Sequence, residues 1–252
     1  MSTLAAVIIT CNEEANIAEC LESLSGTVDQ IIVLDSGSAD STLAIASLYG
    51  ATVAVSSVWH GFGYQKNQAL SMANTDWILS IDADERLTPE LAKEIRSVIN
   101  DTHSFTCYSI PRRSWYCGRF IRFSGWSPDY VDRLFKNGTA RFSDDLVHER
   151  LLHSGPSKRL QNTFLHYSFR NFSQVLQKLD RYSTASARQA YAKGKRASVY
   201  SAVGHGVWAF LRTFVIKGGF LDGSHGLALA ISNAEGTYYK YLKIWQLEQN
   251  NK

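Results

Sequence analysis

The first hundred residues alternate between continuous apolar runs and amphipathic stretches, and this alternation limits the chain to few folds. Residues 4–10 (LAAVIIT) carry no charge, which is typical of a strand buried on both faces of a parallel sheet. Similar runs occupy residues 30–34, 51–55 and 77–81. Helices are expected over residues 13–24, 41–49 and 62–73 and from Thr88-Pro89 onward, with Thr88 as the cap. This order predicts an α/β fold with a mostly parallel, Rossmann-like sheet and helices on both faces.

The pattern changes after about residue 104. Residues 105–111 read as an edge strand, 112–125 as an aromatic, basic loop or hairpin, and 131–135 and 139–142 as short strands. Helical spacing returns from residue 171, with further segments over 198–215 and 227–247. We therefore expect one domain over residues 1–168, with halves at 1–103 and 104–168, and a basic, aromatic helical extension over 169–252.

Charge divides the chain into an acidic and a basic part. Residues 1–100 hold 4 Lys and Arg against 13 Asp and Glu, whereas residues 101–252 hold 22 against 10. A charged fraction of 19% beside 45% hydrophobic residues excludes a disordered tail protein. The two parts are expected to contact different kinds of partner.

Three features indicate a cytoplasmic protein. The N-terminus has no basic residues before its apolar run, which is untypical of a signal peptide. The four cysteines show no CxxC spacing, so free thiols in a reducing compartment are expected. Residues 197–211 lack Asp, Glu, Lys and Arg but fall short of the roughly 18 apolar residues that a membrane-spanning helix needs.

Acidic residues follow three of the four predicted strands, at the sheet edge where open α/β folds bind ligands. Asp82 and Asp84 can share a hard divalent ion that leaves positions for phosphate oxygens, although acids here could also cap the next helix. Asp35 suits a ribose or base contact, with a local turn as the alternative. Asp40 is expected only to cap a helix.

Other nucleotide-binding patterns do not fit the chain. The sequence contains no GxGxxG after the first strand and no GxxxxGK[ST] anywhere. Haloacid-dehalogenase phosphatases also carry Asp-x-Asp, but on their first strand and followed by Thr or Val. Here the motif ends the fourth predicted strand and is followed by Glu85-Arg86.

Taken together, four motifs resemble the family 2 inverting glycosyltransferases of the GT-A fold. They are Thr10-Cys11-Asn12-Glu13-Glu14, residues 32–42 (IVLDSGSADST), Gln65-Lys66-Asn67 and Asp82-Ala83-Asp84. Their order and spacing match over roughly residues 4–150. A narrower similarity to lipopolysaccharide core β-1,4-glucosyltransferases involves residues 34–38, 65–67, 133–135, 147–149 and 219–223.

The resemblance implies a role for each matching position. The first half of the domain would bind a nucleotide-sugar, most simply UDP-glucose, through Thr10, Asn12, Glu13, Asp35, Lys66 and Asp82. Asp84, together with Asp82, would ligate Mg²⁺ or Mn²⁺. For Lys66 the alternative is a solvated lysine on a helix.

Inversion at the anomeric carbon requires a general base on the acceptor hydroxyl. The candidates beyond Asp84 are Asp144, Asp145, His148 and Glu149. Similar enzymes favour Glu149, with Asp145 second and His148 as an orienting or phosphate-binding group. The family's commoner Glu-Asp pair is missing from its usual position, which leaves the choice open. Gln-x-x-Arg-Trp is also missing, which favours transfer of a single sugar.

The C-terminal region suits an anionic membrane surface. Residues 170–252 contain 12 Lys and Arg against 4 Asp and Glu, interleaved with aromatic residues. We expect peripheral binding to the inner face of the cytoplasmic membrane and a lipid-linked saccharide acceptor, contacted by Arg112, Arg113 and Arg133. The same composition would suit single-stranded nucleic acid, but we expect no nucleic acid partner. Packing of these helices on the domain or a homodimer is the remaining alternative.

The resemblance thus implies a metal-dependent hexosyltransferase that adds one sugar, expected to be glucose, to a lipopolysaccharide inner-core acceptor. Two other functions stay open at this point. One is a metal-dependent phosphotransferase or phosphatase that uses Asp82 and Asp84. The other is a non-catalytic protein that binds the membrane surface.

Overall fold

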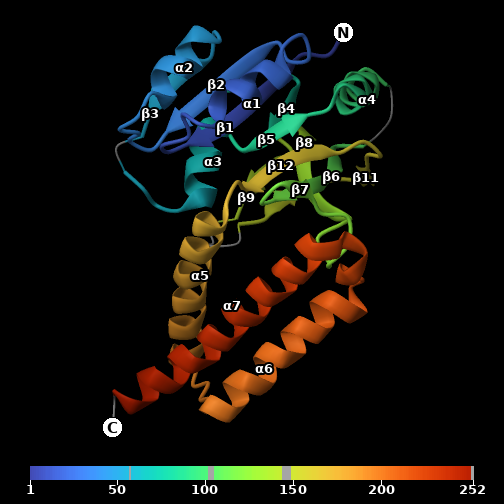
Figure 1. Cartoon of the computed structure of the whole chain (residues 1–252). Coiled ribbons are helices and arrows are strands. Elements are labelled where there is room, and N and C mark those ends of the chain that lie inside the picture. Colours follow the sequence, from blue (N-terminus) through green and yellow to red (C-terminus); the bar gives the residue numbers. More distant parts are fainter. Residues whose placement is uncertain (57, 102–104, 144–148, 251–252) are drawn as a thin grey trace. The chain divides into compact units, whose positions relative to one another are not determined.

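The structure is a computed structural model that describes residues 1–56, 58–101, 105–143 and 149–250. The chain divides into two compact units (Figure 1). Unit 1 comprises Met1–Arg112 and Asp129–His166, and unit 2 comprises Arg113–Pro128 and Tyr167–Lys252. Each unit is described by itself, and the domain boundary predicted at residue 168 stays a prediction.

Four parallel strands form the first part of the sheet in unit 1. They are β1 (Leu4–Thr10), β2 (Gln30–Asp35), β3 (Thr52–Val55) and β4 (Trp77–Ser80), in the order β3-β2-β1-β4. The apolar runs of β1 and β4 are buried because helices cover both faces of the sheet. In the β1–β2 pairing Thr10 lies opposite Asp35, so both strands end at the same edge.

The sheet continues with strands from later in the chain. β4 is followed by β8 (Asp129–Lys136), β6 (Cys107–Tyr116), β12 (Phe164–Phe169) and β5 (Glu85–Leu87), and β11 (Ser157–Arg159) pairs with β6. β9 (Ala140–Phe142) and β10 (Leu151–His153) form a separate pair. The prediction of an edge strand at residues 105–111 is wrong, because β6 lies between β8 and β12. Both neighbours come from later sequence, so no local pattern reveals this position.

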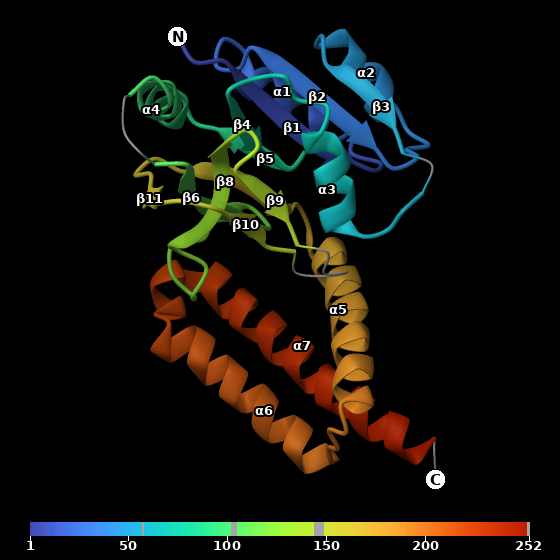
Figure 2. The ribbon, with the colours of Figure 1, turned by 180° about the vertical axis from the view of Figure 1, so that it is seen from behind.

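Four helices cover the sheet of unit 1 (Figures 1 and 2). They are α1 (Ile17–Leu24), α2 (Thr42–Leu48), α3 (Phe62–Leu70) and α4 (Pro89–Ile99). Buried residues of α1, α2 and α4 share a core with Leu4 and Ile8 of β1. Ala69 of α3 packs in a second core with Val7, whose side chain points to the other face. Helices therefore lie on both faces, as predicted.

Unit 2 is built largely from three long helices. α5 (Phe172–Ala192) and α6 (Val199–Leu211) both pack on α7 (Gly223–Gln249), as Figures 1 and 2 show. The α6–α7 contact is close, because Gly206 lies against Tyr238 and the ring of His205 stacks on Tyr241 at 3.8 Å. A π-helical turn (η1, Arg212–Ile216) and a 3₁₀ turn (η2, Gly219–Asp222) connect them. β7 (Arg119–Phe120) pairs with the end of β6 as a hairpin.

The structure changes one expectation about unit 2. Because η1 continues α6 without a break, Val199–Ile216 is 18 residues long and passes the length and composition test for a membrane span. The charge-free stretch stops before Arg212, which is why the sequence predicted a segment that is too short. Only 17% of this helical segment is buried. All four cysteines are free thiols.

Candidate active site

Asp35, at the end of β2, organises the turn that follows it. Its carboxylate is fully buried and accepts hydrogen bonds from Thr10 Oγ1 at 3.0 Å, from the amides of Gly37 and Ser38 at 2.8 and 2.7 Å, and from Ser38 Oγ. Burial raises the pKa of this carboxyl, but the donors outweigh burial and hold the pKa below its usual range. The turn expected as the alternative for Asp35 is therefore present, while its contact with a nucleotide stays a prediction.

Asn12 ties the loop after β1 to the loop after β2. Its amide donates to Ser38 Oγ at 2.7 Å, and its Oδ1 accepts from the Ala39 amide at 2.9 Å. Its φ of 56° lies in the left-handed region, which asparagine tolerates better than most residues. The two loops therefore form one bonded surface at the carboxyl edge of the sheet.

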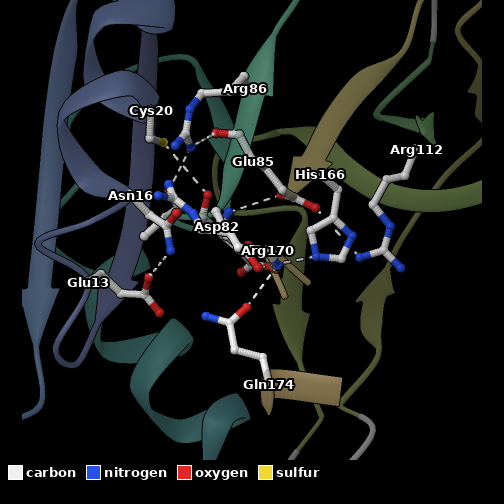
Figure 3. Close-up of polar contacts among 12 residues, drawn as sticks. Glu13, Asn16, Cys20, Asp82, Glu85, Arg86, Arg112, His166, Arg170 and Gln174 are labelled. Carbon is white, nitrogen blue, oxygen red and sulfur yellow. Dashed lines mark hydrogen bonds and ion pairs between the residues drawn. The ribbon is translucent and has the colours of Figure 1, made fainter. Parts of the chain in front are cut away.

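Glu13 is a half-buried carboxyl beside the acids of this edge (Figure 3). Burial is the main cause that raises its pKa, and the negative charges of Asp84, Asp82 and Asp40 add to this shift. A hydrogen bond from Asn16 Nδ2 at 2.7 Å acts in the opposite direction. The shift therefore reflects burial first and the nearby carboxylates second.

Asp82 lies at the centre of a cluster of opposite charges. Its carboxylate is bound by Arg133 Nη2 from β8, and its Oδ1 lies 3.3 Å from Lys66 Nζ of α3. Burial alone would raise the pKa of Asp82, but the charges of Arg133 and Lys66 hold it well below its usual range. Asp82 is therefore ionised at neutral pH. Its charge is balanced by two cations, one from α3 and one from β8.

Glu85 lies beside Asp82 and supports this cluster (Figure 3). It is fully buried, accepts from the Asp82 amide at 3.0 Å and pairs with Arg133 at 3.2 Å and with Arg112 at 3.5 Å. Arg112 also binds Asp129 at 2.6 Å. Arg112 and Arg133 therefore pair with carboxylates of unit 1, and Arg113 is a half-buried residue of unit 2. The acceptor role of all three stays a prediction.

Lys66 joins the donor-side acid Asp82 to the predicted base. Its Nζ lies 2.9 Å from Glu149 Oε1 and 3.3 Å from Asp82 Oδ1, and the lysine is only 6% exposed. The alternative of a solvated lysine is therefore wrong. Of the four base candidates, Asp144, Asp145 and His148 lie outside the described residues, and Glu149 is described.

The face of α3 around Lys66 also holds the chain on either side of residues 144–148. The Asn67 side chain donates to the Phe142 carbonyl at 2.9 Å and accepts from the Phe142 amide at 2.8 Å. Gly63 approaches so closely that an added Cβ would lie 1.9 Å from the Ser143 carbonyl oxygen and 3.6 Å from Glu149 Cβ. Sequence reasoning assigned no role to Gly63 or Asn67, since these contacts join distant segments.

His166 was missed by sequence reasoning and lies beside Asp84. Antiparallel pairing of β12 with β5 places His166 opposite Glu85, and its Nε2 is 3.3 Å from Asp84 Oδ2. No local motif marks this histidine. Among the described residues no three His, Cys, Asp or Glu side chains are grouped to hold a metal. The Asp84 carboxylate nevertheless suits Mg²⁺ or Mn²⁺ where phosphate oxygens and water complete the shell, and the imidazole can join such a shell around Mn²⁺ more readily than around Mg²⁺.

A hollow of about 870 Å³ lies at the opposite edge of the sheet. Its lining includes Met1, Asp76 before β4 and Lys136 at the end of β8. None of the predicted site residues lines it, and ligands of open α/β sheets bind at the carboxyl ends of the strands. We therefore place the candidate active site at the carboxyl edge.

The comparisons with known proteins agree with this geometry. Residues 5–160 match the model of glycosyl transferase family 2. The chain belongs to this family. It is 30% identical to an uncharacterized glycosyltransferase of Rickettsia typhi, over 98% of this chain and 88% of that protein. It is 29% identical to the lipopolysaccharide core biosynthesis glycosyltransferase LpsC of Rhizobium meliloti, over 96% of this chain and 92% of that protein.

A solved structure supports the fold. Staphylococcus aureus TarS superposes with a TM-score of 0.50 at 18% identity, over 66% of this chain and 36% of that chain. The predicted α/β fold of GT-A type is thus confirmed, as is the family resemblance. The chain is a glycosyltransferase, so glycosyl transfer replaces the phosphotransferase and the non-catalytic alternatives.

Proposed function

We propose that this family 2 glycosyltransferase transfers one glucose from UDP-glucose, with inversion, to a lipid-linked inner-core saccharide of lipopolysaccharide. The observation that carries the proposal is the position of Lys66, whose Nζ lies 3.3 Å from Asp82 and 2.9 Å from Glu149. One side chain thus joins a predicted donor carboxylate to the predicted base. The similarity to LpsC, a lipopolysaccharide core biosynthesis glycosyltransferase, supports the acceptor class.

In this proposal the donor lies along the ends of β1, β2 and β4. Thr10, Asn12, Glu13 and Asp35 line the uridine, and the hydrogen bonds of Asp35 and Asn12 keep the two loops in place. Asp82 lies by the ribose, with its charge fixed by Arg133. These hydrogen bonds join the two loops within the chain itself, so the surface needs little rearrangement to receive the nucleotide.

Asp84 and His166, with Asp82 beside them, would hold the predicted Mg²⁺ or Mn²⁺. When bound, the ion neutralises charge that develops on the diphosphate leaving group. The raised pKa of Glu13, which arises first from burial and then partly from the charges of Asp84 and Asp82, is consistent with this assignment. The His166–Asp84 distance of 3.3 Å is short enough for both side chains to reach one ion.

The chemical step is a displacement at the anomeric carbon. The acceptor hydroxyl oxygen forms a bond to this carbon while the bond to the diphosphate oxygen breaks, and UDP leaves. Glu149 takes the hydroxyl proton, a contribution of roughly 10²–10⁴-fold. Lys66 holds the Glu149 carboxylate in place, 2.9 Å from its Nζ, so that the base is positioned for the acceptor hydroxyl. Asp145 is the second choice for this role.

The acceptor is proposed to be reached at the inner face of the cytoplasmic membrane. Residues 170–252 all belong to unit 2, and their excess of Lys and Arg favours anionic lipid. Arg112, Arg113 and Arg133 remain the proposed contacts for acceptor phosphates. A homodimer is the alternative use of the basic helices.

A donor screen tests the proposed function. UDP release is measured with Mn²⁺ and a bacterial membrane extract for UDP-glucose, UDP-galactose and UDP-N-acetylglucosamine. We expect acceptor-dependent release that is fastest with UDP-glucose, and incorporation of labelled sugar into the lipid fraction. Release from none of the donors, or incorporation only of another sugar, would contradict the proposal.

A further inference from the structure

The connection between α6 and α7 displays large apolar side chains to solvent. Phe123, Val215, Ile216, Phe220 and Leu221, which we call the apolar tip, are each between 41% and 61% exposed. They come from two segments of unit 2 that are distant in sequence, the loop after β7 and the turns η1 and η2. An exposed apolar group of this kind usually marks a surface that another molecule covers.

The apolar tip is held rigidly by a buried carboxylate. Asp222 is fully buried and accepts from the amides of Arg122 and Phe123 at 3.0 and 2.9 Å and from Ser124 Oγ at 3.0 Å. These three bonds attach the loop after β7 to η2. Burial of a carboxylate is costly unless its hydrogen bonds are satisfied, so this loop is fixed rather than loosely placed.

Close backbone packing brings the two segments together. The Ser124 amide donates to the Lys217 carbonyl at 2.9 Å. A Cβ added to Gly218 would lie 3.4 Å from Leu221 Cδ1 and 3.7 Å from Phe123 Cδ1, so these two side chains flank the same glycine. The apolar side chains of the loop and of η2 therefore form one surface.

The charges around the apolar tip have one sign. Arg119, Arg122, Arg212 and Lys217 are all exposed. Within residues 113–128 and 197–234, Asp222 is the single Asp or Glu, and its carboxylate is buried. Apolar side chains surrounded by cations match the interface of an anionic bilayer, where acyl chains lie below negative headgroups.

We infer that the apolar tip inserts into the headgroup region of an anionic membrane, with the four basic residues on the lipid phosphates. This inference rests on the membrane-bound acceptor proposed above and names the surface that makes the contact. A second copy of the chain fits less well, because a two-fold contact through this surface would bring its cations together.

A membrane-spanning α6 also fits less well than an inserted tip. α6 packs along α7, where Gly206 meets Tyr238 and His205 stacks on Tyr241. Further along α7 lie Glu235, Lys240 and Lys243, which would be costly to place in the hydrocarbon core. Lys243 is held by Asp180 of α5 at 2.6 Å, so the helices of unit 2 belong to one polar assembly.

Flotation of the full-length protein with vesicles tests the inference. The vesicles contain phosphatidylglycerol and phosphatidylethanolamine, or phosphatidylcholine alone, and neither donor nor sugar acceptor is present. The double variant Phe220→Ser, Leu221→Ser should lower the partition coefficient roughly tenfold on anionic vesicles. The matched control Leu48→Ser, Tyr49→Ser, which removes two exposed residues of unit 1, should leave it unchanged.

A charge variant tests the same surface without removing apolar area. Arg122→Gln with Lys217→Gln should weaken binding about fivefold for each charge at low salt, and the loss should shrink as salt is added. Thermal melting and UDP titration confirm that each variant is folded. If the apolar variant fails this check, the charge variant decides.

Three results would overturn the inference. They are failure of the wild type to float with anionic vesicles at low salt, flotation of both tip variants like the wild type, and an equal loss of binding in the Leu48, Tyr49 control. Sedimentation that shows a dimer dissociated by the tip variants, with flotation unchanged, would assign the surface to a second copy instead. Vesicle binding without turnover of any UDP-sugar would leave the surface in place and contradict the proposed function.

Discussion

Two regions of the molecule each contain a buried or partly buried carboxylate at their centre. The two carboxylates differ in the groups that stabilise their charge. At the active-site edge of unit 1, Asp82 is paired with the cations of Arg133 and Lys66. In unit 2, Asp222 is bound by two amides and a hydroxyl, all neutral donors. The first arrangement balances charge where charged substrates would bind. The second fixes a loop and leaves the nearby cations exposed to solvent.

Because of this difference, mutations in the two regions should change different properties of the protein. A change at the active-site edge disturbs a charge balance that catalysis would use, so it should affect turnover more than folding. A change at Asp222 removes the bonds that shape the apolar tip, so it should affect stability and vesicle binding more than nucleotide binding.

The largest effect is expected for Asp84→Asn. Loss of the carboxylate removes a proposed metal ligand and should lower transfer by about 10³-fold or more. Steady-state assays with saturating Mn²⁺ measure this loss, and circular dichroism should show an intact fold. Asp76→Asn, at the opposite edge of the sheet beside Thr3, is the matched control and should stay active. Near-normal activity of Asp84→Asn in the presence of EDTA would contradict the proposed metal site.

Glu149→Gln tests the base. The amide cannot accept the proton, so kcat should fall roughly 10²–10⁴-fold, while the affinity for UDP changes little because the base contacts the acceptor. Initial rates and UDP titration on the same preparation separate the two quantities. A mild effect at Glu149 together with a large loss in Asp145→Asn would move the role to Asp145.

Asp222→Ala should destabilise unit 2. Three donors lose their acceptor in a buried place, which costs about 1–3 kcal/mol or more, and the melting transition of unit 2 should shift to lower temperature. Vesicle flotation should weaken in parallel, whereas UDP titration should match wild type. Unchanged melting and flotation would show that Asp222 does not hold the apolar tip.

Two Gly→Ala substitutions, one in each unit, should give the smallest changes in the free energy of unfolding. The two changes should have opposite signs. Gly63→Ala places a Cβ 1.9 Å from the Ser143 carbonyl oxygen, so strain of about 1–3 kcal/mol should outweigh the gain in helix propensity. Gly204 of α6 has no atom within 4 Å of an added Cβ, so Gly204→Ala should stabilise by about 0.5–1 kcal/mol. Thermal unfolding measures both, and equal signs would argue against the close packing of α3 on residue 143.

Local patterns in the sequence predicted the nucleotide half of the fold well. The apolar run of β1 and the Thr88-Pro89 start of α4 are signals that neighbouring residues carry, and the structure contains both elements. The acids at the strand ends were found for the same reason, because parallel strands deliver consecutive segments to one edge. Their convergence therefore follows from the order of elements alone.

Contacts between distant segments could not be predicted in this way. The place of β6 depends on β8 and β12, and His166 meets Asp84 only through the register of β12 on β5. The pairing of Lys66 with Asp82 and Glu149 joins a helix, a strand end and a loop. The length of the apolar segment at 199–216 was missed because a π-helical turn continues α6 past Arg212.

The central claim is that the carboxyl edge of unit 1 binds a nucleotide diphosphate through a divalent ion. Calorimetric titration of the full-length protein with UDP, first in Mn²⁺ and then in excess EDTA, tests it most directly. We predict saturable binding with Mn²⁺ that EDTA abolishes and that the Phe220, Leu221 variant retains. Absence of binding in Mn²⁺, or equal binding after EDTA, would contradict it.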